Sequence, residues 1–93
     1  MAPDDAEQAV VDVVCAPPYT WDCGWAVATV LCESGGRADA YNPAPHYGWW
    51  QIDYWFAGWD DPAMNTEKAW VKYQSAVRYW SDGTHPWPVC GRR

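Results

Sequence analysis

Four cysteines in a chain of 93 residues are the strongest constraint on this fold. A single domain of this size has a small core and often needs covalent support. An even number of cysteines in a short chain is typical of disulfides formed in an oxidising, extracellular setting. Zinc is the alternative, but no two of the four are spaced as Cys-x-x-Cys. The sequence therefore predicts one domain, stapled by disulfides and without a metal site, whose cysteines allow three pairings: Cys15, Cys23, Cys32 and Cys90.

The charge balance bears on the choice of partner. The formal net charge is −6, and the largest basic cluster is Arg92-Arg93. Because a nucleic-acid-binding surface is basic, we expect no DNA or RNA partner. No apolar run approaches the length of a membrane span. Residues 1–7 are acidic and do not resemble a signal peptide.

Two segments in the first third of the chain have helical patterning. Residues 4–14 place alanine and valines on one helical stripe, and Pro17-Pro18 follows. Residues 25–32 carry no charge, with Asp22 or Thr20 available as an N-cap and two glycines as a stop signal. We expect the second helix to be the central one in the core.

A third helix is predicted from Asp61-Pro62 to a point near Gly83. Its apolar residues fall at i, i+4, i+7, i+8 and i+11, which is one face of a helix and should close the core: Ala69, Tyr73, Ala76, Val77 and Trp80.

One carboxyl group has an unusual setting. Glu33 follows the uncharged segment and precedes Gly35-Gly36, so it should lie in the last turn of a buried helix. Burial and the negative end of the helix dipole both raise the pKa of a carboxyl group. Glu33 is therefore a candidate general acid. The alternative is a surface residue beside a glycine cap.

Residues 35–48 predict a long irregular loop folded around Asn42, and residues 47–55 predict a short strand, hairpin or helical turn. Nine tryptophans are several times the ordinary usage of this residue, and sugar rings stack on indoles. We expect those within predicted helices to fill the core. The candidates to face a sugar are Trp49, Trp50, Trp55 and Trp59.

Taken together, these motifs resemble a known family. Glu33-Ser34 followed by residues 48–52, Gly-Trp-Trp-Gln-Ile, resembles the Glu-Ser and Gly-Leu-Met/Phe-Gln-Ile motifs of soluble lytic transglycosylases and goose-type lysozymes, especially small secreted actinobacterial and phage versions. The resemblance spans roughly residues 15–90 and departs at the family's third motif, Ala-Tyr-Asn, for which Tyr73 or Tyr79 would have to substitute. It continues through Ala40-Tyr41-Asn42-Pro43, Asp61-Pro62, Asn65 and Trp87-Pro88-Val89-Cys90.

The resemblance implies a mostly α, lysozyme-like α+β fold with a short β or irregular cleft flap. Residues 1–14 would form an N-terminal helix and residues 15–93 the transglycosylase domain, one domain overall. It also favours a disulfide between Cys32 and Cys90, which leaves Cys15 to pair with Cys23.

The activity implied by the resemblance is cleavage of the β-1,4 bond between N-acetylmuramic acid and N-acetylglucosamine, with Glu33 as the single acid and base. The partner would be a peptidoglycan glycan strand, with no cofactor or metal. We expect a monomer that works extracellularly or in the cell wall, secreted or phage-delivered. The implied substrate-binding residues are Ser34, Asn42, Tyr47, Gly48, Trp49, Trp50, Gln51, Ile52 and Tyr73.

Other interpretations remain open. The missing third motif favours a non-catalytic peptidoglycan-binding or structural module of a phage tail or cell-wall protein. A two-carboxylate glycosidase would need a partner such as Asp53, which is more readily a capping or exposed acid. A serine hydrolase is disfavoured because no Gly-x-Ser-x-Gly occurs and both histidines, His46 and His85, lie in loop sequence beside proline.

Overall fold

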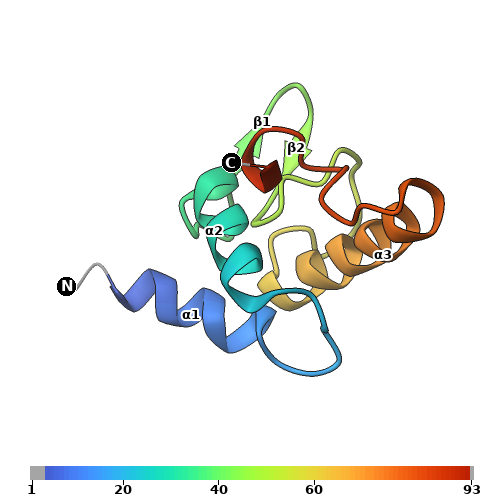
Figure 1. The fold of residues 1–93 in the computed structure, drawn as a ribbon. Coiled ribbons are helices and arrows are strands. Elements are labelled where there is room, and N and C mark those ends of the chain that lie inside the picture. Colours follow the sequence, from blue (N-terminus) through green and yellow to red (C-terminus); the bar gives the residue numbers. More distant parts are fainter. Residues whose placement is uncertain (1–3, 93) are drawn as a thin grey trace.

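The computed structural model describes residues 4–92, so residues 1–3 of the predicted N-terminal helix and residue 93 of the predicted main domain lie outside the described part. About half of the chain is helical, and a short two-stranded antiparallel sheet lies between the second and third helices. Figure 1 shows this order. The elements are α1 (Asp4–Val14), α2 (Cys23–Ser34), β1 (Tyr41–Asn42), β2 (His46–Tyr47), α3 (Pro62–Trp80) and the 3-10 helix η1 (Cys90–Arg92).

Helix α2 has the caps that the sequence predicts. The Asp22 side chain accepts a hydrogen bond of 2.8 Å from the backbone N–H of Trp25. Gly35 takes the left-handed conformation with φ 66°, and its N–H donates to the Leu31 carbonyl at 2.9 Å. The N-cap and the glycine stop are therefore confirmed, and Glu33 lies in the last turn.

Both disulfides form in the pairing that the resemblance implied. Cys15 pairs with Cys23 and joins the end of α1 to the start of α2. Cys32 pairs with Cys90 across 58 residues and holds η1 against the C-terminal end of α2, where Figure 1 places both. All four cysteines are used, which leaves no thiolate for zinc.

Tryptophans join distant parts of the chain through the core. Valines of α1 pack with buried indoles from the loops and the tail in one hydrophobic cluster. Because a buried indole N–H needs an acceptor, each such ring also fixes a backbone or side-chain oxygen. Five of these bonds, 2.8–3.1 Å long, run from Trp21 to Val14 O, Trp25 to Gly91 O, Trp49 to Gly36 O, Trp50 to Thr66 Oγ1 and Trp87 to Trp50 O.

Helix α3 begins at Pro62 as predicted but does not bury the whole predicted face. Ala69 and Ala76 are buried, whereas Val77 is 47% exposed and Trp80 is 63% exposed. The prediction that the last turn of α3 closes the core is therefore wrong. The tail supplies that part instead, because Trp87 is only 2% exposed and takes the place beside Trp50.

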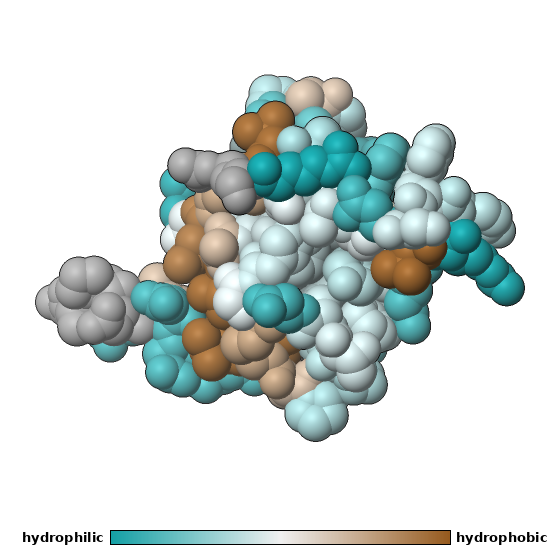
Figure 2. Space-filling view, viewed as in Figure 1, coloured by the Kyte–Doolittle hydropathy of each residue, from teal (hydrophilic) through white to brown (hydrophobic). Residues whose placement is uncertain are grey.

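Strongly apolar side chains form no broad patch on the face drawn in Figure 2. They form a narrow strip over α2 and the end of α1, with small separate spots, and the rest is hydrophilic or of intermediate hydropathy. Within the described residues, no helix combines the length and the apolar character needed to cross a membrane.

Candidate active site

Glu33 occupies the setting that the sequence predicts. Its side chain is half-buried in the last turn of α2, one residue from the disulfide at Cys32. Burial raises the pKa of the Glu33 carboxyl above its ordinary value, and the nearby charge of His46 lowers it in part. A carboxyl group with a raised pKa retains its proton closer to neutral pH.

The loop after α2 contains a small hairpin. β1 and β2 pair so that Asn42 lies opposite His46, and the predicted irregular loop over residues 35–48 is therefore partly a sheet. Tyr47 and Ile52 then exchange two backbone hydrogen bonds of 2.9 Å. His46 precedes Tyr47 and Asp53 follows Ile52. The bridge therefore brings His46 and Asp53 close to each other.

Asp53 and Glu33 have opposite electrostatic environments. Asp53 accepts a hydrogen bond of 2.9 Å from Lys72 of α3, and this bond is the largest cause of its lowered pKa. The charge of His46 lowers the pKa of both carboxyl groups. The Asp53 side chain is 60% exposed, in line with an exposed acid rather than a buried partner of Glu33. Burial thus raises the pKa of the Glu33 carboxyl, whereas the bond to Lys72 lowers that of Asp53.

Asn65 fixes the segment between His46 and Asp53. It is fully buried in the first turns of α3. Its amide nitrogen donates to the carbonyls of Tyr47 at 2.9 Å and Trp59 at 3.0 Å, and its amide oxygen accepts from the Trp50 N–H at 2.8 Å. One side chain thus satisfies three buried backbone groups.

Gly48 is required by packing at this point. Its φ is 73°, and a Cβ there would collide with the Asn65 amide and the Trp59 carbonyl. The close approach that the glycine permits is to the protein itself. Contact of Gly48 with a sugar stays a prediction.

Gln51 and Ser34 both support the loop. The Gln51 amide nitrogen donates to the carbonyls of Ala40 at 3.2 Å and Gly48 at 3.0 Å, and its oxygen makes no hydrogen bond within residues 4–92. The Ser34 hydroxyl donates to the Val30 carbonyl at 3.0 Å and accepts from the Gly36 N–H at 3.3 Å. The Ser34 hydroxyl is therefore engaged within the end of α2, and contact of Ser34 with a substrate stays a prediction.

The expectation that Trp49 and Trp50 face a sugar is wrong. Their exposures are 3% and 0%, and their indole N–H groups bond to Gly36 and Thr66. Ile52 is also fully buried. These three side chains hold the Gly48–Ile52 segment against the core, so they cannot touch a ligand without local unfolding.

The remaining predicted binding residues are dispersed. The Asn42 side chain is exposed and accepts a hydrogen bond of 3.0 Å from the Ala44 N–H at the hairpin tip. Because side chains alternate along a strand, Tyr47 lies on the opposite face of the hairpin from His46. There its ring contacts Trp59, with centroids 5.4 Å apart.

Tyr73, expected to replace the absent third motif, packs in the aromatic core. Its ring stacks on Trp70 with centroids 5.6 Å apart and also contacts Trp21 and Trp25. Gly83 lies against the same ring. A substrate-binding role for Tyr73 stays a prediction beside this clear structural one.

From the sequence, Asn65 is named only as part of the resemblance and His46 only as a loop histidine, and Lys72 is not singled out. In the structure, Asn65 anchors the Gly48–Ile52 segment, Lys72 is the partner of Asp53, and the charge of His46 acts on both carboxyl groups. Asn65 and the buried Thr66 also form a polar pair inside the first helical turns, and this mismatch with an apolar stripe is a further signal in the sequence.

The chain matches no protein-family model, no curated protein and no solved structure. The described residues contain no group of three or more His, Cys, Asp or Glu side chains placed to hold a metal ion. The site is therefore defined by its own geometry: a half-buried Glu33, the imidazole of His46 and an ionised Asp53 held by Lys72. This arrangement suits proton transfer to a bound substrate.

Proposed function

We propose that this protein cleaves the β-1,4 bond between N-acetylmuramic acid and N-acetylglucosamine in peptidoglycan. The observation that carries the proposal is the raised pKa of Glu33, a half-buried carboxyl at the end of a core helix. The order of motifs around it, Glu33-Ser34 and then residues 48–52, supports the same assignment. Two disulfides are compatible with work outside the cell.

In the first step, the Glu33 carboxyl donates its proton to the glycosidic oxygen. The bond between that oxygen and C1 of the muramyl residue breaks, and N-acetylglucosamine leaves with a free 4-hydroxyl. The Glu33 carboxylate then takes a proton from the muramyl 6-hydroxyl, whose oxygen bonds to C1 and gives a 1,6-anhydro product. If it instead takes the proton from a water that bonds to C1, the product is a hydrolysed strand.

Neighbouring residues tune this proton transfer. Burial favours the protonated form of Glu33, as the first step requires, and the charge of His46 opposes it in part. Lys72 keeps Asp53 ionised and fixed at the far side of the Tyr47–Ile52 bridge. Asn65 holds the backbone between them, so the relative position of these groups is built into the fold.

The test is the release of soluble fragments from purified peptidoglycan by the wild type and by Glu33→Gln. We expect the variant to lose activity by about a hundredfold or more, the usual range for removing a general acid. Glu7→Gln is the matched control, since it makes the same change at an exposed side chain on α1. Equal release by wild type and Glu33→Gln would refute the assignment.

The second candidate is a module that binds glycan strands without cleaving them. The use of the Gln51 amide nitrogen and the Ser34 hydroxyl inside the fold favours it, because fewer polar groups remain to assist Glu33. Co-sedimentation with insoluble peptidoglycan, without fragment release by the folded wild type, would establish this alternative.

A further inference from the structure

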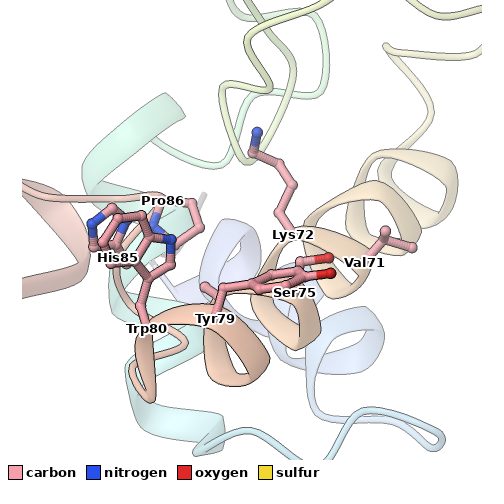
Figure 3. A pocket seen from close by; sticks show the side chains of 8 residues that line it. Val71, Lys72, Ser75, Tyr79, Trp80, His85 and Pro86 are labelled. Atoms are coloured by element: carbon pink, nitrogen blue, oxygen red, sulfur yellow. The ribbon is translucent and has the colours of Figure 1, made fainter.

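A hollow on the surface includes Lys72, the partner of Asp53, in its lining. This open hollow of about 220 Å³ is formed between the C-terminal half of α3 and the tail that follows it. Figure 3 shows Trp80, His85 and Pro86 together at one end, the Tyr79 side chain reaching toward Ser75, and Lys72 extending away from the rings.

Tyr79, Trp80 and His85 form the aromatic wall of the hollow, and burial in the core does not account for the two largest rings. Trp80 is 63% exposed and Tyr79 is 75% exposed. His85 stacks on Trp80 with ring centroids 4.3 Å apart and planes 4° from parallel. The stack holds the indole in one orientation while leaving most of it to solvent, so the hollow has a preorganised flat surface.

Polar groups border this surface. Ser75, which carries a hydroxyl, and Lys72 are among the lining residues, and the Tyr79 ring carries a phenol. Within residues 4–92 the Trp80 indole N–H makes no hydrogen bond, in contrast to the five core indoles. Flat apolar faces edged by donors and acceptors complement a pyranose ring, which has apolar C–H faces and hydroxyl groups at its rim.

Lys72 links the hollow to the candidate active site through a chain of contacts. It is one of the lining residues, and its ammonium group donates a hydrogen bond of 2.9 Å to Asp53. Asp53 in turn flanks the Tyr47–Ile52 bridge beside His46, whose charge acts on Glu33. Lys72, Asp53 and His46 therefore connect the lining of the hollow with the surroundings of Glu33.

We propose that the hollow is a distal sugar subsite, which binds an N-acetylhexosamine ring of the same glycan strand that Glu33 cleaves. This rests on the proposed function. Trp80 and Tyr79 supply the stacking surface, His85 fixes the indole, and Ser75 and Lys72 supply hydrogen bonds to hydroxyl or N-acetyl groups.

The test measures binding of a β-1,4-linked N-acetylglucosamine hexamer to the Glu33→Gln protein, which cannot consume it. In ¹⁵N spectra, the indole signal lost in Trp80→Ala identifies Trp80, and this signal should shift on titration. By calorimetry, adding Trp80→Ala or Tyr79→Ala to the Glu33→Gln background should weaken binding about tenfold, the equivalent of about 1.4 kcal/mol. Val77→Ala is the matched control, being an exposed apolar truncation on α3 outside the hollow.

The two proposals fail in different ways. The subsite would be overturned if Trp80→Ala bound the hexamer as tightly as the Val77→Ala control and if the Trp80 signal of the Glu33→Gln protein did not move on titration. This holds even if the wild type cleaves peptidoglycan. A wild type that cleaves nothing, yet binds the hexamer in a Trp80-dependent way, would refute the catalytic role and retain the sugar site. Unchanged melting temperatures in all three variants would show that lost affinity is not lost folding.

Discussion

Replacing Asn65 by alanine should cost this small domain a large part of its stability. The side chain is fully buried and makes hydrogen bonds of 2.8, 2.9 and 3.0 Å to three backbone groups. Each bond contributes roughly 0.5–1.5 kcal/mol, and buried partners left without one cost more. We therefore expect a loss of about 3–4 kcal/mol, against a total of about 5–15 kcal/mol for an ordinary domain.

Urea unfolding followed by tryptophan fluorescence measures this loss directly. In thermal unfolding the same loss lowers Tm by roughly 12–30 °C for a domain of this length. Gln74→Ala is the control, because it removes an exposed amide from the same helix and should change stability by less than about 0.5 kcal/mol. A loss below about 1 kcal/mol in Asn65→Ala would refute the role of Asn65 as the anchor of the Gly48–Ile52 segment.

Three further predictions concern the same framework. Replacing Cys32 and Cys90 by serine removes a link across 58 residues. On the chain-entropy model, calorimetry should show that the free energy of unfolding falls by about 4 kcal/mol, and a fall below about 1 kcal/mol would contradict this. Gly48→Ala places a Cβ at φ 73° against the Asn65 amide. Chemical unfolding should show that the free energy of unfolding falls by about 2 kcal/mol or more, and a variant as stable as the wild type would show that the loop adapts freely. Because burial raises the pKa of Glu33, the folded state binds its proton more tightly than the unfolded state does, and stability falls as the pH rises from the unfolded value of about 4.3 through the folded pKa. Glu33→Gln escapes that fall, so its stability relative to wild type should be higher at about pH 8 than at about pH 4, and an equal difference at the two pH values would contradict the raised pKa.

The helices could be predicted because their signals are local. Asp22 caps α2, Gly35 ends it and Pro62 starts α3, and each acts through its own backbone geometry or a hydrogen bond within one turn. The position of Glu33 follows from the same signals. Its half-buried setting could therefore be inferred before any tertiary contact was known.

The arrangement of the Gly48–Ile52 segment depends on contacts between residues far apart in the sequence. A local sequence pattern does not predict such contacts. Trp49 and Trp50 are both buried: Asn65 and Thr66 hold Trp50, and the Gly36 carbonyl holds the Trp49 indole. Trp80 continues an apolar stripe in sequence, yet Trp87 from the tail fills the core in its place. In both cases the residue that decides which tryptophan is buried lies elsewhere in the chain.

The central claim is that Glu33 supplies the proton that breaks the glycan strand. Mass spectrometry of the muropeptides released from purified peptidoglycan by wild type and Glu33→Gln tests it most directly. The account predicts fragments cut between N-acetylmuramic acid and N-acetylglucosamine from the wild type, ending in either a 1,6-anhydro or a reducing muramyl residue, and none above background from the variant. The same fragments from both proteins, or none from a folded wild type with both disulfides formed, would contradict it.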